Sequence, residues 1–203
     1  MGGEPLLHPT PDAFINITRE IFPLADLRVV TNGLLLKKAS VAFWEACRKA
    51  QVTLNISVYA VLESSAHDVL EFCAQQKVRV EARHKNTFYA QINPHGDSDP
   101  IRSFDYCRSL YYCPFLFNSR LYVCALPPTV QYYNEKFGRS IPGDPGIDFY
   151  DPQLDGQQIL KLLETPVETC RFCAVIYTAY AWERSHKQFR AEDWEVNTVT
   201  KNL

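Results

Sequence analysis

Five cysteines in the second half of the chain constrain its fold more than any other feature. Three are spaced Cys107-x5-Cys113-x10-Cys124, and a Cys-x2-Cys pair follows at Cys170 and Cys173. Two thiolates in a Cys-x2-Cys pair can bind one metal centre through a single tight turn, whereas the other three must be brought to it by folding. The spacing therefore predicts a metal site, drawn from these five residues, that ties distant segments together.

The two remaining cysteines, Cys47 and Cys73, lie in amphipathic helical stretches. A free cysteine in such a position most often behaves as a small buried hydrophobe, so we predict that both belong to the core. An odd total of seven cysteines also fits poorly with a complete disulfide framework. An iron-sulfur cluster and a four-cysteine zinc site use similar spacings, so the residues alone leave the metal open.

The composition indicates a globular protein and excludes several classes of partner. The 203 residues are 46% hydrophobic and 13% aromatic, which is enough for a packed core. A net charge of -2 and scattered Lys and Arg residues argue against nucleic-acid binding. No run approaches the ~20 apolar residues of a membrane span, and no secretion signal opens the chain. We therefore expect a cytoplasmic protein with no nucleic-acid or membrane partner.

Helical and extended patterns alternate along the first half, which predicts an α/β fold with parallel strands. Turn-forming residues from Asn93 to Pro100 predict a boundary, giving a βα domain at 1–98 and a cysteine-rich domain at 99–203. The expected helices cover about 12–22, 38–50, 65–76 and 154–164, and the expected strands cover about 27–33, 52–59, 78–82 and 87–92.

Parallel strands present their ligand contacts at one shared edge, where their carboxyl ends meet. Three loops are expected at that edge, and they contain the candidate cofactor-binding residues. These residues are Gly2, Gly3, Glu4, Asn32, Ser57 and Tyr59. The alternative for the Gly-Gly-Glu string is an ordinary exposed turn before a helix.

The opening segment, from Gly2-Gly3-Glu4 through Pro5-Leu6-Leu7-His8-Pro9, resembles the second-strand motif of radical SAM enzymes. That resemblance implies a partial radical SAM (βα) barrel in which Gly-Gly-Glu contacts the methionyl ammonium of S-adenosylmethionine. It also implies that the 27–33 strand is the third barrel strand. Asn55, Ser57 and Tyr59 would then lie on the fourth strand, near the ribose or carboxylate of the same ligand.

The cysteine-rich half resembles the auxiliary-cluster regions of the same superfamily, called SPASM or, in shorter form, twitch domains. Their pattern is a cysteine, a glycine roughly a dozen residues later, then four residues and another cysteine. Cys107, Ser119 and Cys124 match it, with Ser119 in place of glycine. The resemblance implies one auxiliary 4Fe-4S cluster held by Cys107, Cys124 and Cys170 or Cys173, with Cys113 completing the set and one cysteine spare. It also implies a peptide or protein substrate.

The chain departs from the family because it contains no Cys-x3-Cys-x2-Cys, the motif that binds the catalytic cluster. We therefore expect an amino-terminally truncated member that cannot itself cleave S-adenosylmethionine to the 5'-deoxyadenosyl radical. An alternative from another class is a non-catalytic, zinc-stabilised binding module. A third alternative is a chain that does not fold stably, because a barrel without its first strand exposes a sheet edge.

Overall fold

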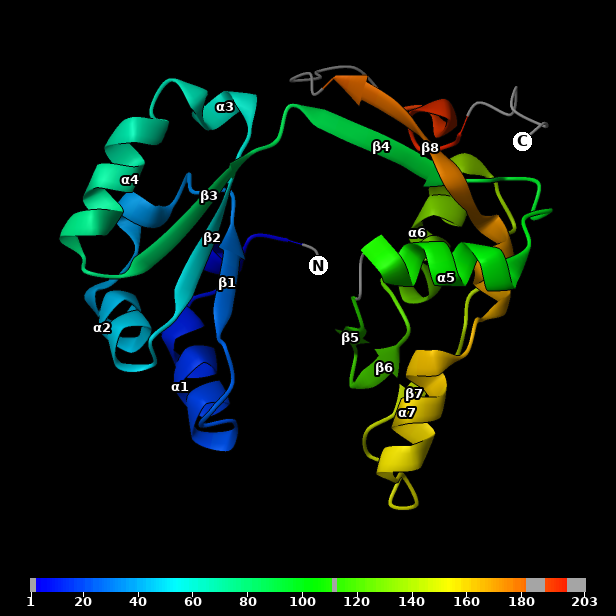
Figure 1. The fold of residues 1–203 in the computed structure, drawn as a ribbon, viewed down its shortest axis with the longest axis horizontal. Helices are drawn as coiled ribbons and strands as arrows, with labels where there is room; N and C mark the ends of the chain where they lie inside the picture. The colour runs from blue at the N-terminus through cyan, green and yellow to red at the C-terminus, as the bar shows by residue number, and fades with distance from the viewer. Residues whose placement is uncertain (1–2, 111–112, 182–188, 197–203) are drawn as a thin grey trace. The chain divides into compact units, whose positions relative to one another are not determined.

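A computed structural model describes residues 3–110, 113–181 and 189–196, which form a mixed α/β chain with two compact units (Figure 1). The N-terminal unit contains residues 3–88 together with Ala181, and the C-terminal unit contains residues 89–180 and 189–196. The turn-rich segment at 93–100 lies within the C-terminal unit. Within the described ranges, no helix is both long enough and apolar enough to cross a bilayer.

The N-terminal unit alternates helices and strands. Its helices are η1 (Pro5–Leu7), α1 (Pro11–Ile21), η2 (Leu36–Lys38), α2 (Val41–Lys49), α3 (Ala60–Glu63) and α4 (Ala66–Gln75), and its strands are β1 (Arg28–Thr31), β2 (Thr53–Val58) and β3 (Arg79–His84). The Ser40 hydroxyl caps α2 by accepting a hydrogen bond from the Phe43 N–H. Arg19, in the last turn of α1, donates hydrogen bonds to the Ala25 carbonyl in the following loop at 2.9 Å and to the Ala50 carbonyl at the end of α2 at 2.7 Å. These bonds connect α1 to the C-terminal end of α2.

The three strands form a parallel sheet in the order β1-β2-β3, with Thr31 beside Ile56 and Leu54 beside Val80. One face of this sheet packs against the helices. Leu54, Ile56 and Val58 of β2 are each at most 1% exposed on that face. The helices pack on one another through ring contacts, because Trp44 of α2 meets Phe72 of α4 edge-on at 5.7 Å. Cys47 and Cys73 are buried in this core, as predicted.

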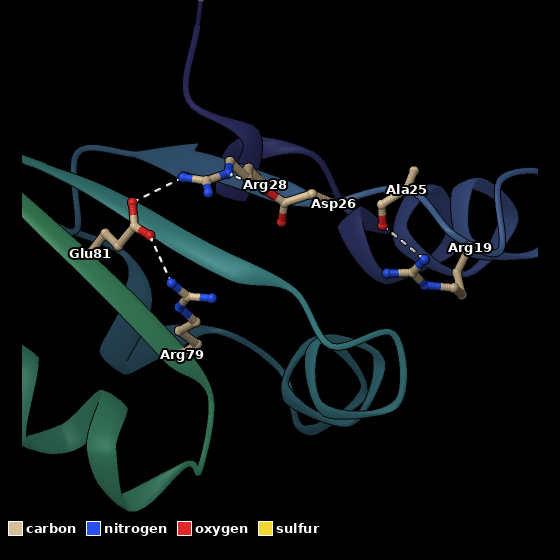
Figure 2. A network of polar contacts seen from close by, with 6 residues as sticks. All are labelled: Arg19, Ala25, Asp26, Arg28, Arg79 and Glu81. Carbon is tan, nitrogen blue, oxygen red and sulfur yellow. Dashed lines mark hydrogen bonds and ion pairs between the residues drawn. The ribbon is translucent and has the colours of Figure 1, made fainter.

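The opposite face of the sheet is polar (Figure 2). Arg28 of β1 bonds to Asp26 at 2.7 Å and to Glu81 of β3 at 2.9 Å, and Arg79 lies 3.4 Å from the other oxygen of Glu81. Asn55 of β2 lies on the same face, and its buried Oδ1 accepts no hydrogen bond from any described residue. An unsatisfied buried acceptor costs about 1–3 kcal/mol in the folded state.

The C-terminal unit consists of short strands and helices around a smaller core. Its helices are α5 (Pro100–Leu110), α6 (Leu126–Phe137), α7 (Gly156–Glu164), η3 (Glu168–Phe172) and η4 (Ala191–Asp193). Its strands are β5 (Phe115–Phe117), β6 (Arg120–Tyr122), β7 (Ile147–Asp148) and β8 (Cys173–Ala181), while β4 (Thr87–Ile92) begins in the N-terminal unit. The strands form two small sheets, β4-β8 and β5-β6-β7. Ile92, Val130, Tyr133 and Ile141 form the buried core.

Candidate metal centre and ligand edge

Four separate segments of the C-terminal unit carry the five cysteines. Cys107 lies in the last turn of α5, and Cys124 lies two residues before the start of α6. Cys170 lies in η3, and Cys173 is the first residue of β8. Helix α5 packs directly against η3, which brings the segments of Cys107 and Cys170 together. Cys113 lies in the segment before β5 and is exposed.

The thiols are close enough to affect one another's ionisation. Burial, followed by the charges of Cys107, Cys170 and Cys113, raises the pKa of the Cys124 thiol to about 12, although a hydrogen bond from the Leu126 N–H acts in the opposite direction. Burial first, and then the charges of Cys124, Cys170 and Cys107, raise the pKa of Cys173. Such coupling arises only between groups that lie near one another.

The pattern of coupling separates four thiols from the fifth. Every pair among Cys107, Cys124, Cys170 and Cys173 is coupled, since burial and then Cys107 also act to raise the pKa of Cys170. Cys113 acts on Cys107 and Cys124 alone. We call these four thiols the tetrad, and the place of Cys113 among the ligands stays a prediction.

Polar side chains with no motif of their own hold the Cys-x2-Cys segment in place. The Ser103 hydroxyl of α5 donates to the Cys173 carbonyl at 3.0 Å, and the Thr169 hydroxyl donates to the Pro142 carbonyl at 3.0 Å. Both side chains are buried. The Asn93 N–H donates to the Phe172 carbonyl at 2.8 Å. Three hydrogen bonds to other parts of the unit therefore hold the segment from Thr169 to Cys173 in place.

Ser119 lies in a backbone conformation that favours glycine. The hairpin that joins β5 to β6 turns through Asn118 and Ser119, whose φ angles are 47° and 61°. Two consecutive positive φ angles are typical of a type I′ turn, which glycine adopts without a steric penalty. This hairpin leads directly to Cys124.

The tetrad is not arranged as a finished coordination sphere in the described part of the chain. Among residues 3–110, 113–181 and 189–196, no three His, Cys, Asp or Glu side chains form a group that could hold a metal ion as they stand. The raised pKa values keep these thiols protonated at neutral pH, and a metal must displace those protons before thiolates can bind it. Metal uptake at the tetrad would therefore require both deprotonation and a local rearrangement of these side chains.

The candidate ligand edge of the N-terminal unit brings Glu4 and Asn32 together. The Glu4 carboxylate accepts hydrogen bonds from the Asn32 N–H at 2.8 Å, the Thr31 hydroxyl at 2.7 Å and the Leu6 N–H at 3.2 Å. Gly3, beside it, is exposed and has a φ of 79°, while Gly2 lies outside the described residues. Glu4 therefore joins the segment that follows Gly3 to the carboxyl end of β1.

Ser57 and Tyr59 lie at the carboxyl end of β2, beside the end of β1. Ser57 is half-buried on the same polar face as Asn55. The Tyr59 ring stacks on Phe88 at 5.7 Å between ring centres. The edge therefore gathers the candidate residues from two neighbouring strand ends along one side of the sheet.

In comparisons with known proteins, no model of a protein family matches this chain, and no curated protein is similar enough in sequence to count as a relative.

Proposed function

We propose that this chain carries the S-adenosylmethionine-binding edge and the auxiliary-cluster region of a radical SAM enzyme that acts on a peptide or protein. The N-terminal unit would contribute part of a radical SAM barrel, with Gly2, Gly3, Glu4, Asn32, Ser57 and Tyr59 along its ligand edge. The tetrad in the C-terminal unit would bind one 4Fe-4S cluster.

The single observation that carries the proposal is the electrostatic coupling among Cys107, Cys124, Cys170 and Cys173, which come from three separate segments. Four thiolates are the ligand set of a 4Fe-4S cluster. When bound, such a cluster supplies a one-electron redox centre. The protein side chains position the ligands, since Ser103 and Thr169 fix the Cys-x2-Cys segment and the Leu126 N–H stabilises the thiolate form of Cys124.

The polar face of the N-terminal sheet supports the ligand edge. Ser57, half-buried beside Asn55 on this face, offers a hydrogen bond to a polar molecule. The three intrachain hydrogen bonds of Glu4 occupy both of its oxygens, which leaves it a smaller share in ligand binding than the family resemblance implies. The backbone of exposed Gly3 and the side-chain NH2 of Asn32 are then the remaining contacts.

A four-cysteine site equally suits structural zinc, so a non-catalytic zinc-stabilised module is the second candidate. Anaerobic purification, followed by reconstitution with iron and sulfide and analysis of bound metals, separates the two. About four iron and four sulfide per chain would support the cluster, whereas one zinc with no iron or sulfide would support the module. The same sample should release no 5'-deoxyadenosine from S-adenosylmethionine, because the chain has no Cys-x3-Cys-x2-Cys.

A further inference from the structure

A cavity in the C-terminal unit is lined by none of the cysteines. It has a volume of about 360 Å³ and lies between α6 and the segment that carries Phe189 and Trp194. Its floor is formed by the buried side chains of Ile92 and Val130. Small-molecule pockets range from about 300 to 1,000 Å³, so this cavity suits a small ligand.

The rim of the cavity exposes large aromatic side chains to water. Tyr132, Phe189 and Trp194 are 56%, 59% and 48% exposed. Covering such rings gains free energy in proportion to the apolar area removed from water, at roughly 25 cal/mol per Å². An apolar or aromatic ligand seated on the floor would cover them, which gives the cavity a driving force for binding.

The far wall is held in place by backbone pairing with β4. The Trp194 carbonyl accepts hydrogen bonds from the N–H groups of Gln91 and Ile92, at 3.2 and 3.1 Å, and the Val196 N–H donates to the Ile92 carbonyl at 2.8 Å. Trp194 is therefore positioned by the fold and does not depend on a ligand for its place.

The acidic group next to Trp194, Glu195, is already neutralised within the described residues. It accepts hydrogen bonds from Tyr133 and from two nitrogens of Arg139, at 2.8 and 3.2 Å for the arginine. Lys136, in contrast, lines the cavity and forms no ion pair with any described residue. The Lys136 ammonium therefore presents a positive charge to a ligand in a cavity whose other lining residues are mostly apolar.

We propose that this cavity is a binding site for a small aromatic or aliphatic carboxylate, with its apolar body on Ile92 and Val130 and its carboxylate toward Lys136. The site is independent of the proposed cluster and of the S-adenosylmethionine edge. A positive group at the mouth of an apolar pocket selects an anionic ligand over a neutral one of equal size.

The test compares three ligands that share one apolar body. Calorimetric titration of the full chain with 3-phenylpropionate, 3-phenylpropanol and 3-phenylpropylamine should give affinities that decrease in that order. The acid should bind about three- to five-fold more tightly than the alcohol, as expected for one partly exposed ion pair. Equal affinities for the three ligands, or no saturable binding by any, would overturn the proposal.

Variants localise the binding. Lys136→Met should reduce the affinity for the acid to that for the alcohol and leave the alcohol unchanged, whereas Lys161→Met, on exposed α7, should change neither. Thr129→Phe should fill the cavity and weaken all three ligands. If Thr129→Phe does not fold, the comparison of the two lysine variants still decides, because equal behaviour of Lys136→Met and Lys161→Met would contradict the site. Trp194 fluorescence should change on binding, and Trp194→Phe should abolish that change.

Discussion

The Glu4 carboxylate accepts a hydrogen bond from the Asn32 N–H at 2.8 Å and joins the turn before η1 to the loop that follows β1. The two residues are 28 positions apart in the sequence, and their hydrogen bond holds the segment before η1 against the ligand edge. Because the same carboxylate also receives the Thr31 hydroxyl and the Leu6 N–H, Glu4 has a structural role whether or not a ligand binds nearby.

Removing this carboxylate should destabilise the N-terminal unit. Glu4→Ala leaves the N–H groups of Asn32 and Leu6 without their acceptor, and we expect the free energy of unfolding to fall by about 1–3 kcal/mol. Urea unfolding followed by the fluorescence of buried Trp44 measures the change. The control is Glu20→Ala on the exposed side of α1, which should have little effect. Equal stabilities of the two variants would show that the Glu4 contacts contribute nothing.

The hairpin before Cys124 gives a stabilising prediction. Ser119 has a φ of 61°, which strains a residue with a Cβ, so Ser119→Gly should raise the free energy of unfolding by about 0.5–1 kcal/mol. The substitution also places a glycine directly after Asn118, and Asn-Gly is the preferred sequence for a type I′ turn. Ser140→Gly, at an exposed position with ordinary φ, should instead lower stability slightly. A loss of stability in both variants would contradict this account of the turn.

Alanine substitutions at two glycines with nearly the same φ angle distinguish the cost of backbone strain from the cost of a steric clash. Gly138 and Gly146 have φ values of 62° and 61°, but only Gly146 is crowded, since an added Cβ would lie 2.7 Å from the Leu121 carbonyl oxygen and 2.7 Å from the Tyr122 ring. Gly138→Ala should cost about 1 kcal/mol, from backbone strain alone. Gly146→Ala should cost a further 1–3 kcal/mol, roughly, because the clash involves backbone. Thermal unfolding of the two variants tests the difference, and equal losses would refute it.

The N-terminal half could be predicted because its hydrophobic periodicity is strong and each element packs locally. The expected strand at about 52–59 and helix at about 65–76 correspond closely to β2 and α4. Helices α5 and α6 were not predicted. Pro127 and Pro128 open α6 and suggest a turn, although proline is favoured in the first turn of a helix.

The contacts within the two candidate sites could not be predicted from the sequence either. The spacing of the cysteines indicates a shared centre, but which thiols are coupled depends on how α5 packs against η3, and that packing is not encoded locally. Likewise, no short motif reveals that Glu4 is occupied by Asn32, or that Trp194 returns to pair with β4. These contacts join residues far apart in the chain, where periodicity and motif spacing carry no information.

The Tyr133–Glu195–Arg139 network should make stability depend on pH. Burial alone would raise the pKa of Glu195, but hydrogen bonds from Arg139 and Tyr133, together with the charges of Arg139 and His95, hold it below its usual value of 4.5. A carboxyl group with a lowered pKa stabilises the folded state above about pH 4.5, and this contribution is lost as the pH falls through the folded-state pKa. Glu195→Gln should therefore lower the urea midpoint at neutral pH and converge with the wild type in acid. The exposed control Glu192→Gln should match the wild type throughout, and a Glu195→Gln deficit that persists in acid would contradict the assignment.

Single cysteine substitutions test the tetrad directly. Cys107→Ser, Cys124→Ser, Cys170→Ser and Cys173→Ser should each remove most of the iron, sulfide and visible absorption of the reconstituted chain, since a missing thiolate leaves the cluster with an incomplete ligand set. Cys113→Ser is the matched control, because Cys113 is exposed and acts on only two of the other thiols. It should retain nearly all of the metal, whether the site holds a cluster or zinc. If Cys113→Ser lost as much metal as Cys124→Ser while Cys170→Ser or Cys173→Ser kept it, the ligand set would include Cys113 and the tetrad would be wrong.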